Sequence, residues 1–338
     1  MANIIENLLK SDEPSIRYKT RVRVLGEDED SSEVRRLREE IRASKRIRTL
    51  LSNRDDQGRI QPVHHPYKKW TGAHWVLATL ADIGHPGGDE DLIPIRDQVL
   101  DNWLNPESIR EIEYEEAPPR QRFRGVPILR GRARRCASQQ GNALYSAIAL
   151  GLMDERCDQL AECLMRWQWP DGGWNCDRRP EAQVSSFWET LLPLRGLAHY
   201  ARSTGSKQAS EAVSRAAEVF LIRKLFRSCS IGEVMNPQFI RLHYPCYWRY
   251  DILAGLKVIA EAGLIGDERC RAALDLIESK RLPDGGWPAE ERFYKVSPET
   301  ISNGEFVSWG GVHKTRMNEW ITVDALYVLR DAGRWAPG

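Results

Sequence analysis

The sequence predicts an all-α protein built as an α/α6 barrel, a ring of inner helices enclosed by a ring of outer helices. Two observations predict this fold. The motif Pro-Asp-Gly-Gly-Trp occurs twice, at 170–174 and 283–287, about two repeat periods apart. Two kinds of helical segment also alternate along the chain, and such an alternation can bury its apolar faces by closing into two concentric rings.

The predicted inner helices are apolar around most of their circumference, as expected for helices that are buried on more than one face. Most of them end in a glycine that can cap the helix C-terminus. They are 14–26, 69–84, 139–151, 185–200, 247–263 and 318–333, of which 14–26 has the weakest pattern.

The predicted outer helices carry one apolar stripe and one charged face, which indicates partial exposure to solvent. They are 32–52, 91–104, 154–167, 208–226 and 267–280, with 3–10 as a short sixth member. We expect one domain over 1–338, in which 1–30 completes the two rings and 105–134 forms a charged insertion or lid.

Each Asp-Gly-Gly-Trp motif follows an outer helix. Glycine supplies the positive φ angle that a tight turn needs, and we expect the Trp ring to pack back over the preceding helix. The first copy fits the pattern Q-x-x-x-G-x-W with Gln168, Gly172 and Trp174, whereas the second has Arg281 in place of Gln. The motif is therefore predicted to fasten neighbouring repeats together.

This pattern is the QW motif of squalene-hopene and oxidosqualene cyclases, and "GGWNCD…SSFWETLLPLRGL" resembles the repeat of protein prenyltransferase β subunits. The chain thus resembles the terpenoid cyclase and prenyltransferase toroid superfamily over roughly 30–335. The resemblance implies a toroid with a central site for an apolar, isoprenoid substrate. It does not extend to the motifs of the known reactions, because D-x-D-D, D-D-x-x-D and the zinc-binding D-x-C are absent. Glu189 stands in place of the Tyr-His-Thr motif that supplies a zinc ligand in the prenyltransferases. Because this motif and D-x-C are both missing, we expect no metal and no cofactor.

Composition limits the remaining possibilities. The 338 residues are 41% apolar and 29% charged, which suits a globular protein with a sizeable core. The net charge of +1 gives no overall attraction for nucleic acid. The start lacks the basic and apolar regions of a signal peptide, no window reaches the length of a membrane span, and the seven cysteines lack C-x-x-C spacing. We therefore expect a cytoplasmic protein with reduced thiols.

The first turns of the inner helices carry polar and aromatic residues that would meet at one mouth of a barrel. The predicted catalytic residues are Glu189, Asp251, His74 and Asp324. The predicted substrate-binding residues are Trp70, Trp75, Asn142, Tyr145, Trp188, Tyr247, Trp248 and Trp320. Such an aromatic cup with a few convergent polar groups is typical of a small-molecule site.

Structural roles compete with catalytic ones at these positions. Ser186 and Glu189 fit a capping box, Asp251 could pair with Arg249, and His74 could be a satisfied core histidine. Taken one at a time, each Trp residue is more often part of the hydrophobic core than of a binding site.

Three further features have open roles. The loop 63–70 contains His64 and His65, and 120–135 is rich in arginine, which suits either pairing with nearby glutamates or binding of an anion. Cys136 and Cys176 precede inner helices at the same rim, so a role for their thiols stays open.

Three functions fit these observations. The first is an enzyme that cyclises, isomerises or hydrates an apolar, isoprenoid substrate by acid-initiated chemistry, for which aromatic faces stabilise cations. The second is a carbohydrate-active hydrolase or lyase that uses paired carboxylates. The third is a non-catalytic protein that binds a small apolar molecule.

Overall fold

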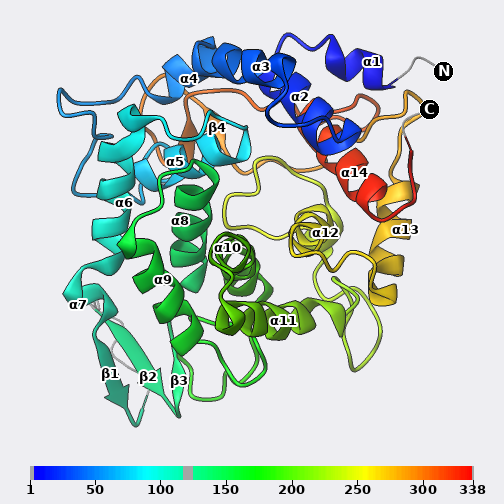
Figure 1. Ribbon diagram of the computed structural model, residues 1–338. Helices are drawn as coiled ribbons and strands as arrows, with labels where there is room; N and C mark the ends of the chain where they lie inside the picture. Colours follow the sequence, from blue (N-terminus) through cyan, green and yellow to red (C-terminus); the bar gives the residue numbers. More distant parts are fainter. Residues whose placement is uncertain (1–3, 117–124, 337–338) are drawn as a thin grey trace.

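The computed structural model describes residues 4–116 and 125–336, and most of its regular structure is helical (Figure 1). The α-helices are α1 (Ile4–Leu9), α2 (Pro14–Lys19), α3 (Ser32–Arg42), α4 (Lys45–Leu50), α5 (Ala73–Asp82), α6 (Ile93–Leu104), α7 (Pro106–Ile109), α8 (Ala137–Ala149), α9 (Glu155–Arg166), α10 (Phe187–Thr204), α11 (Lys207–Leu221), α12 (Ile252–Glu261), α13 (Arg271–Ser279) and α14 (Glu319–Asp331). A π-helix, η1 (Thr20–Leu25), continues α2, and short 3-10 turns occur at η2 (Glu90–Leu92), η3 (Pro237–Ile240) and η4 (Glu268–Cys270).

The buried helices pack on one another in chain order. Helix α5 contacts α8, α8 contacts α10, α10 contacts α12, and α12 contacts α14, which in turn contacts α2 and η1. Tyr18 of α2 lies so close to Gly84, after α5, that an added Cβ there would be 2.3 Å from the Tyr18 ring. Helix α2 is therefore also a neighbour of the end of α5.

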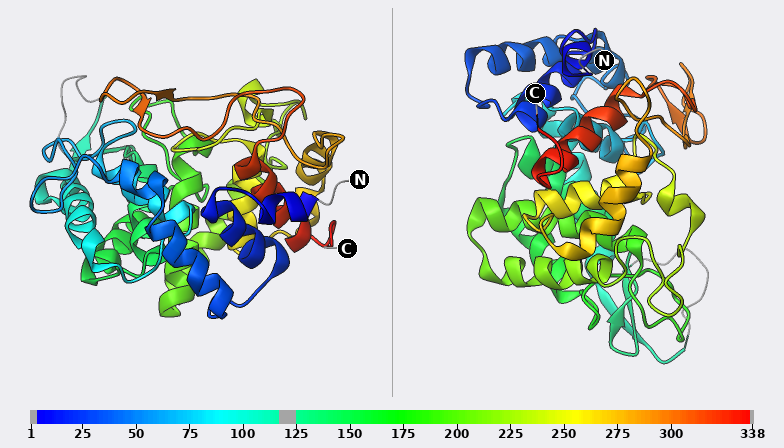
Figure 2. Two further views of the ribbon diagram at one scale, coloured as in Figure 1. Left: turned by 90° about the horizontal axis from the view of Figure 1, so that it is seen from above. Right: turned by 90° about the vertical axis from the view of Figure 1, so that its right-hand side faces the viewer.

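Amphipathic helices lie outside the buried ones, as Figure 1 shows for α3, α6, α9, α11 and α13. In α9, for example, Cys157, Leu160 and Leu164 are buried while the acidic side of the helix faces solvent. The segment 288–318 has little regular structure and runs along one side of the molecule (orange in Figure 2, left).

The structure differs from the prediction in several segments, among them 32–52, which forms two helices (α3 and α4), 247–263 and 105–134. The helix expected over 247–263 begins only at Ile252, because Asp251 caps it and Tyr247 has a positive φ of 50°. The segment 105–134 contains α7 and a small sheet of β1 (Glu111–Tyr114), β2 (Val126–Leu129) and β3 (Arg132–Ala133), with β1 parallel and β3 antiparallel to β2. A second pair, β4 (Lys295–Val296) and β5 (Gly304–Glu305), is parallel.

The two Asp-Gly-Gly-Trp motifs form the same contacts. Nε1 of Trp174 donates to the carbonyl of Leu164 in α9 at 2.9 Å, and Nε1 of Trp287 donates to the carbonyl of Ile277 in α13 at 2.7 Å. Both rings are almost completely buried. The prediction that each Trp packs back over the preceding outer helix is confirmed.

Each motif also holds the next buried helix. The backbone N–H of Trp174 donates to Oγ1 of Thr190 in α10, and that of Trp287 donates to Oγ1 of Thr322 in α14. Gln168 Nε2 donates to the carbonyl of Gly172 at 2.7 Å, and in the second motif Arg281 Nε makes the equivalent bond to Gly285 at 3.1 Å. Arginine therefore preserves this bond where the second copy lacks glutamine.

We expect Trp174→Ala to lower the free energy of unfolding by about 3 kcal/mol, because it removes a fully buried ring and leaves the carbonyl of Leu164 without its donor. Denaturant unfolding of this variant beside Trp188→Ala, at a half-buried position, measures the difference. Equal stability of Trp174→Ala and the wild type would show that the motif does not fasten the repeats.

Within the described residues, no helix is both long enough and apolar enough to cross a membrane.

Candidate functional site

A largely apolar cavity lies between α5, α10, α12 and α14 and the loop that precedes α12. Its wall includes Trp75, Leu191, Tyr244, Tyr247, Leu253, Val258 and Ile321 together with the polar residues Asp82, Asn142, Arg195, His243, Arg249, Asp251, Lys257 and Asp324. Of the predicted site residues, the structure thus brings Trp75, Asn142, Tyr247, Asp251 and Asp324 to one cavity. A mainly apolar wall that also carries convergent polar groups is typical of a ligand site.

His243 and Asp251 form a hydrogen-bonded pair in the wall of this cavity. The Nδ1 atom of His243 lies 3.1 Å from Oδ2 of Asp251 and 3.2 Å from the carbonyl oxygen of Arg241. Both neighbours are acceptors, so Nδ1 carries a proton. The Nε2 atom of the same ring is buried and has no hydrogen-bond partner among the described residues. The hydrogen-bonding capacity of this nitrogen is therefore not used by the described residues.

Asp251 is fixed by three donors at once. Its Oδ1 accepts from the backbone N–H of Ala254 at 2.8 Å, which caps α12, and its Oδ2 accepts from the backbone N–H of His243 at 2.9 Å in addition to the ring. The alternative that Asp251 pairs with Arg249 is wrong, because the Arg249 guanidinium lies over the Phe293 ring at 3.7 Å. The carboxylate instead orients His243.

A mostly buried charge network of three cations and three carboxylates borders one end of the cavity, where Asp82 and Lys257 are half-buried. Its members are Lys19, Asp82, Arg195, Lys257, Glu261 and Asp324. Lys257 Nζ lies 2.9 Å from both Asp82 and Asp324, and Lys19 Nζ lies 2.8 Å from Asp324. Arg195 binds Glu261 through two bonds of 2.6 and 2.8 Å. Asp324 therefore lies between two ammonium groups.

The network also shifts the ionisation of its members. Burial by itself would raise the pKa of Asp82, but Lys257, Lys19 and Arg195 hold it well below its usual range. Burial opposes the charge of Lys257 too, yet Asp324 and Asp82 raise its pKa above the ordinary value. Asp82, Arg195, Lys257 and Asp324 line both the apolar cavity and a second, polar cavity that contains Tyr145. The network thus separates the two.

His74 lies next to the apolar cavity but not in its wall. Trp103 Nε1 donates to its Nδ1 at 3.2 Å, and its Nε2 lies 3.3 Å from the amide of Asn142. Burial lowers the pKa of His74 to about 3, so the ring is neutral. Both ring nitrogens of His74 therefore have hydrogen-bond partners, as expected for a histidine with a structural role in the core.

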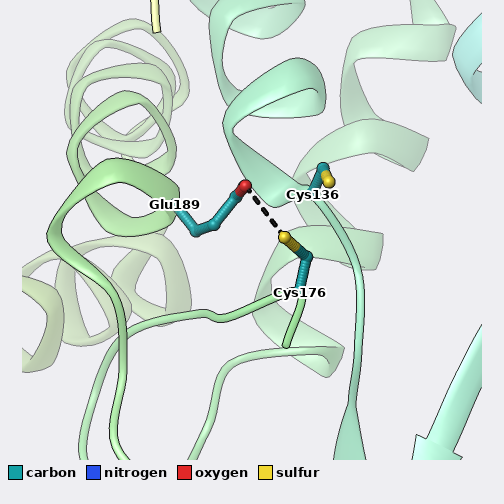
Figure 3. A group of neighbouring side chains, drawn as sticks. All are labelled: Cys136, Cys176 and Glu189. Carbon is teal, nitrogen blue, oxygen red and sulfur yellow. Dashed lines mark hydrogen bonds between the residues drawn. The ribbon is translucent and has the colours of Figure 1, made fainter. Parts of the chain in front are cut away.

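Glu189 faces a different group of side chains (Figure 3). Its Oε2 accepts from the backbone N–H and the hydroxyl of Ser138 at 3.2 and 2.9 Å, and its Oε1 accepts from Sγ of Cys176 at 3.2 Å. Cys136 completes the group. The alternative of a capping box with Ser186 is wrong, because the side chain of Ser186 makes no cap bond. Glu189 instead connects α10 to the start of α8.

The predicted aromatic residues divide among several clusters. Trp70 stacks on Tyr247 with ring centroids 3.8 Å apart, and both contact Trp75. Trp75 and Tyr247 line the cavity, whereas Trp70 is not part of its wall. Trp188 and Trp248 meet edge to face at 6.2 Å. Two others lie near the charge network: Trp320 stacks on Tyr244, and Tyr145 lies under the Arg195 guanidinium at 3.6 Å.

Glu305 is an unpredicted buried carboxyl beside this wall. Tyr247 donates its hydroxyl to Oε2 at 2.9 Å and the N–H of Phe306 donates to Oε1 at 2.8 Å. Burial raises the pKa of Glu305 to about 7. Because this segment has no helical periodicity, only the isolated glutamate between apolar residues could have indicated it.

We expect Glu305 to make the protein less stable as the pH rises. A carboxyl whose pKa is higher in the folded state favours folding fully below its unfolded value of about 4.5, and this contribution is lost as the pH passes the folded value near 7. The loss amounts to about 3 kcal/mol if the shift is complete. Thermal melts at pH 5 and pH 8 should show that Glu305→Gln loses less stability than the wild type.

The exposed Glu299→Gln, on the same segment, is the control and should behave as the wild type. Identical pH dependence of Glu305→Gln and the wild type would contradict the assignment.

The arginine-rich stretch 120–135 has structural contacts at Arg134. Arg134 donates to the carbonyls of Asp177 and Ala182 and stacks on Trp169 at 4.4 Å. The expected pairing of 120–135 with the preceding glutamates falls partly on 117–124, outside the described residues. Glu111 pairs with Arg166 at 2.8 Å. His64 and His65 are not members of either group of potential metal ligands among the described residues.

No family model and no curated protein matches this chain. Its structure is similar to solved structures of variants of the type II terpene cyclase MstE from Scytonema. One, in complex with geranylgeranyl dihydroxybenzoate, has 14% identity and a TM-score of 0.26 over 85% of this chain and 95% of that chain. Another, in complex with merosterolic acid A, has 16% identity and a TM-score of 0.25 over 85% and 94%.

Proposed function

We propose that this chain is an enzyme resembling the terpenoid cyclases, which moves a proton to and from an apolar, isoprenoid substrate and so cyclises, isomerises or hydrates it. The proposal includes an α/α6 toroid formed by 1–338 as one domain, with the substrate in the apolar cavity. The isoprenoid class comes from the resemblance of Gln168, Gly172 and Trp174 to the QW motif.

The observation that carries the proposal is the pair of His243 and Asp251. A buried imidazole held by a carboxylate at Nδ1, with an unpartnered Nε2, is suited to general acid–base chemistry. The apolar residues of the wall can receive a hydrocarbon substrate.

In this mechanism the protonated His243 donates from Nε2 to a carbon of a substrate double bond, and the neighbouring carbon becomes cationic. Asp251 holds the ring and stabilises its charged form, which makes it a positioning residue. The faces of Trp75 and Tyr247 stabilise the cation. Loss of a proton from an adjacent carbon to Nε2 gives an isomer. Attack of a second double bond of the substrate on the cation forms a C–C bond, and loss of a proton from the resulting cation to Nε2 gives a ring. Addition of water, with loss of its extra proton to Nε2, gives an alcohol. The three outcomes share the same first step.

The carbohydrate alternative needs two carboxylates free to act as acid and base. In this cavity Asp82 and Asp324 are each held by lysines, and Asp251 is held by His243. No contact in the cavity favours that alternative.

Native mass spectrometry of freshly purified protein tests the proposal first. We expect an apolar small molecule to be retained, whereas a retained saccharide would contradict it. Turnover of the retained compound by the wild type, and not by His243→Gln, would support an enzyme, and binding without turnover would leave the binding-protein alternative in its place.

A further inference from the structure

Cys136, Cys176 and Glu189 form a group that the proposed proton transfer does not use. Cys136 precedes α8, Cys176 lies on the loop after the first Asp-Gly-Gly-Trp motif, and Glu189 comes from the first turn of α10 (Figure 3). The two Sγ atoms and a carboxylate oxygen all lie within 4.8 Å of one another, and Cys176 Sγ is 3.2 Å from Glu189 Oε1. Three separate segments within 136–189 therefore place three potential ligand atoms close together.

The spacing suits a tetrahedral metal ion. With Zn–S bonds of about 2.3 Å and a Zn–O bond of about 2.0 Å, neighbouring ligand atoms of such a site lie about 3.5 Å apart. In this group the ligand atoms lie at most 4.8 Å from one another, and Cys176 Sγ lies 3.2 Å from Glu189 Oε1, so the expected separation falls between these two distances. Small changes of side-chain rotamer would complete the geometry.

Glu189 is already oriented as a metal ligand would be. Its Oε2 accepts from both the N–H and the hydroxyl of Ser138, which leaves Oε1 to accept from Sγ of Cys176. Cys136 lies beside them. A ligating carboxylate that is held in this way by an outer hydrogen bond is a regular feature of metal sites. All three ligands are half-buried, so an ion can enter from solvent.

We propose that Cys136, Cys176 and Glu189 bind one Zn²⁺ ion, with water at the fourth position. Two thiolates and one carboxylate select zinc over magnesium or calcium, which prefer oxygen ligands. Three protein ligands with an open fourth position are typical of zinc sites that take an added ligand. The geometry thus reverses the expectation of no metal, which was based on the absence of D-x-C in the sequence. This inference does not depend on the function of His243.

The test is metal content and a cobalt spectrum of the full chain, purified and kept under a thiol reductant. We expect one equivalent of zinc per chain. After exchange, Co²⁺ should give a thiolate-to-metal charge-transfer band that Cys136→Ser weakens and the double variant Cys136→Ser/Cys176→Ser abolishes. Ser138→Ala retains all three ligands and should lower the zinc affinity 10- to 100-fold, because it removes a bond that orients Glu189.

Two control variants locate the ion. Cys229→Ser removes an exposed thiol, and Cys246→Ser removes the thiol beside His243 and Asp251, so both should leave the metal content and the cobalt band unchanged. Circular dichroism checks that each variant is folded.

Absence of zinc and of a cobalt band in the reduced wild type would overturn the proposal. Loss of the band in Cys246→Ser but not in the double variant would overturn it as well, and would assign the ion to His243, Cys246 and Asp251. A Cys136–Cys176 disulfide in unreduced protein, with no metal bound after reduction, would show a redox pair in place of a metal site.

Discussion

Asp82→Asn is expected to lower the free energy of unfolding by about 3–5 kcal/mol, the usual effect of removing one partner from a buried ion pair. Asp82 accepts from Lys257 and from the hydroxyl of Tyr244 at 2.9 Å, and it lies within 4 Å of Lys19 and Arg195. An amide would leave these cations with one carboxylate fewer in a buried site. Denaturant unfolding at neutral pH measures the change.

Asp275→Asn is the matched control, because Asp275 pairs with Arg334 at 2.6 Å but is 60% exposed. An exposed pair of this kind contributes about 1 kcal/mol at most. If Asp82→Asn were no more destabilising than Asp275→Asn, the charge network would not be a structural element of the fold.

The same network gives acid sensitivity. The pKa of Asp82 is lowered in the folded state, so its contribution to stability is complete above the unfolded value near 4 and is lost as the pH falls towards the lowered folded value. Below pH 4 we expect the free energy of unfolding of Asp82→Asn to fall less steeply with decreasing pH than that of the wild type.

His243→Gln is expected to reduce turnover by a factor of about 10²–10⁴, the usual contribution of a general acid or base, with little effect on the melting temperature. Asp251→Asn should also reduce turnover, since an amide can cap α12 but cannot accept the Nδ1 proton and the backbone N–H of His243 as a carboxylate does. A turnover assay beside a thermal melt separates the chemical effect from a loss of structure.

His199→Gln serves as the control, because His199 lines the polar cavity on the other side of the charge network. It should retain wild-type turnover. Full activity in His243→Gln would exclude the pair as the proton donor and would leave Glu305, behind Tyr247, as the next buried acid to test.

The sequence was sufficient to predict the helical class, the alternation of buried and amphipathic helices, and the contacts of Trp174 and Trp287. These features depend on local periodicity and on a repeated turn. Helix boundaries were less accurate at 247–263, because the cap at Asp251 and the positive φ of Tyr247 interrupt an apolar pattern that continues through them.

The site was only partly predictable. Asp251 was singled out, but His243 lies in a loop without periodicity, and its contact with Asp251 is a feature of the folded loop. The charge network had a signal that could have been used: charged residues occur within the predicted buried helices, and three of them are positive and three are negative. They are Lys19, Asp82, Arg195, Lys257, Glu261 and Asp324. Because such charges are buried only when paired, they could have been predicted to meet. Which ones pair depends on the packing of the helices.

The most direct test of the proposed function is the incorporation of deuterium from D₂O into the product formed from the retained apolar compound. If His243 starts the reaction by donating a solvent-derived proton to carbon, mass spectrometry should find one deuterium bound to carbon in the wild-type product and almost no labelled product with His243→Gln. A product without carbon-bound deuterium, or equal labelling by the wild type and His243→Gln, would contradict the account.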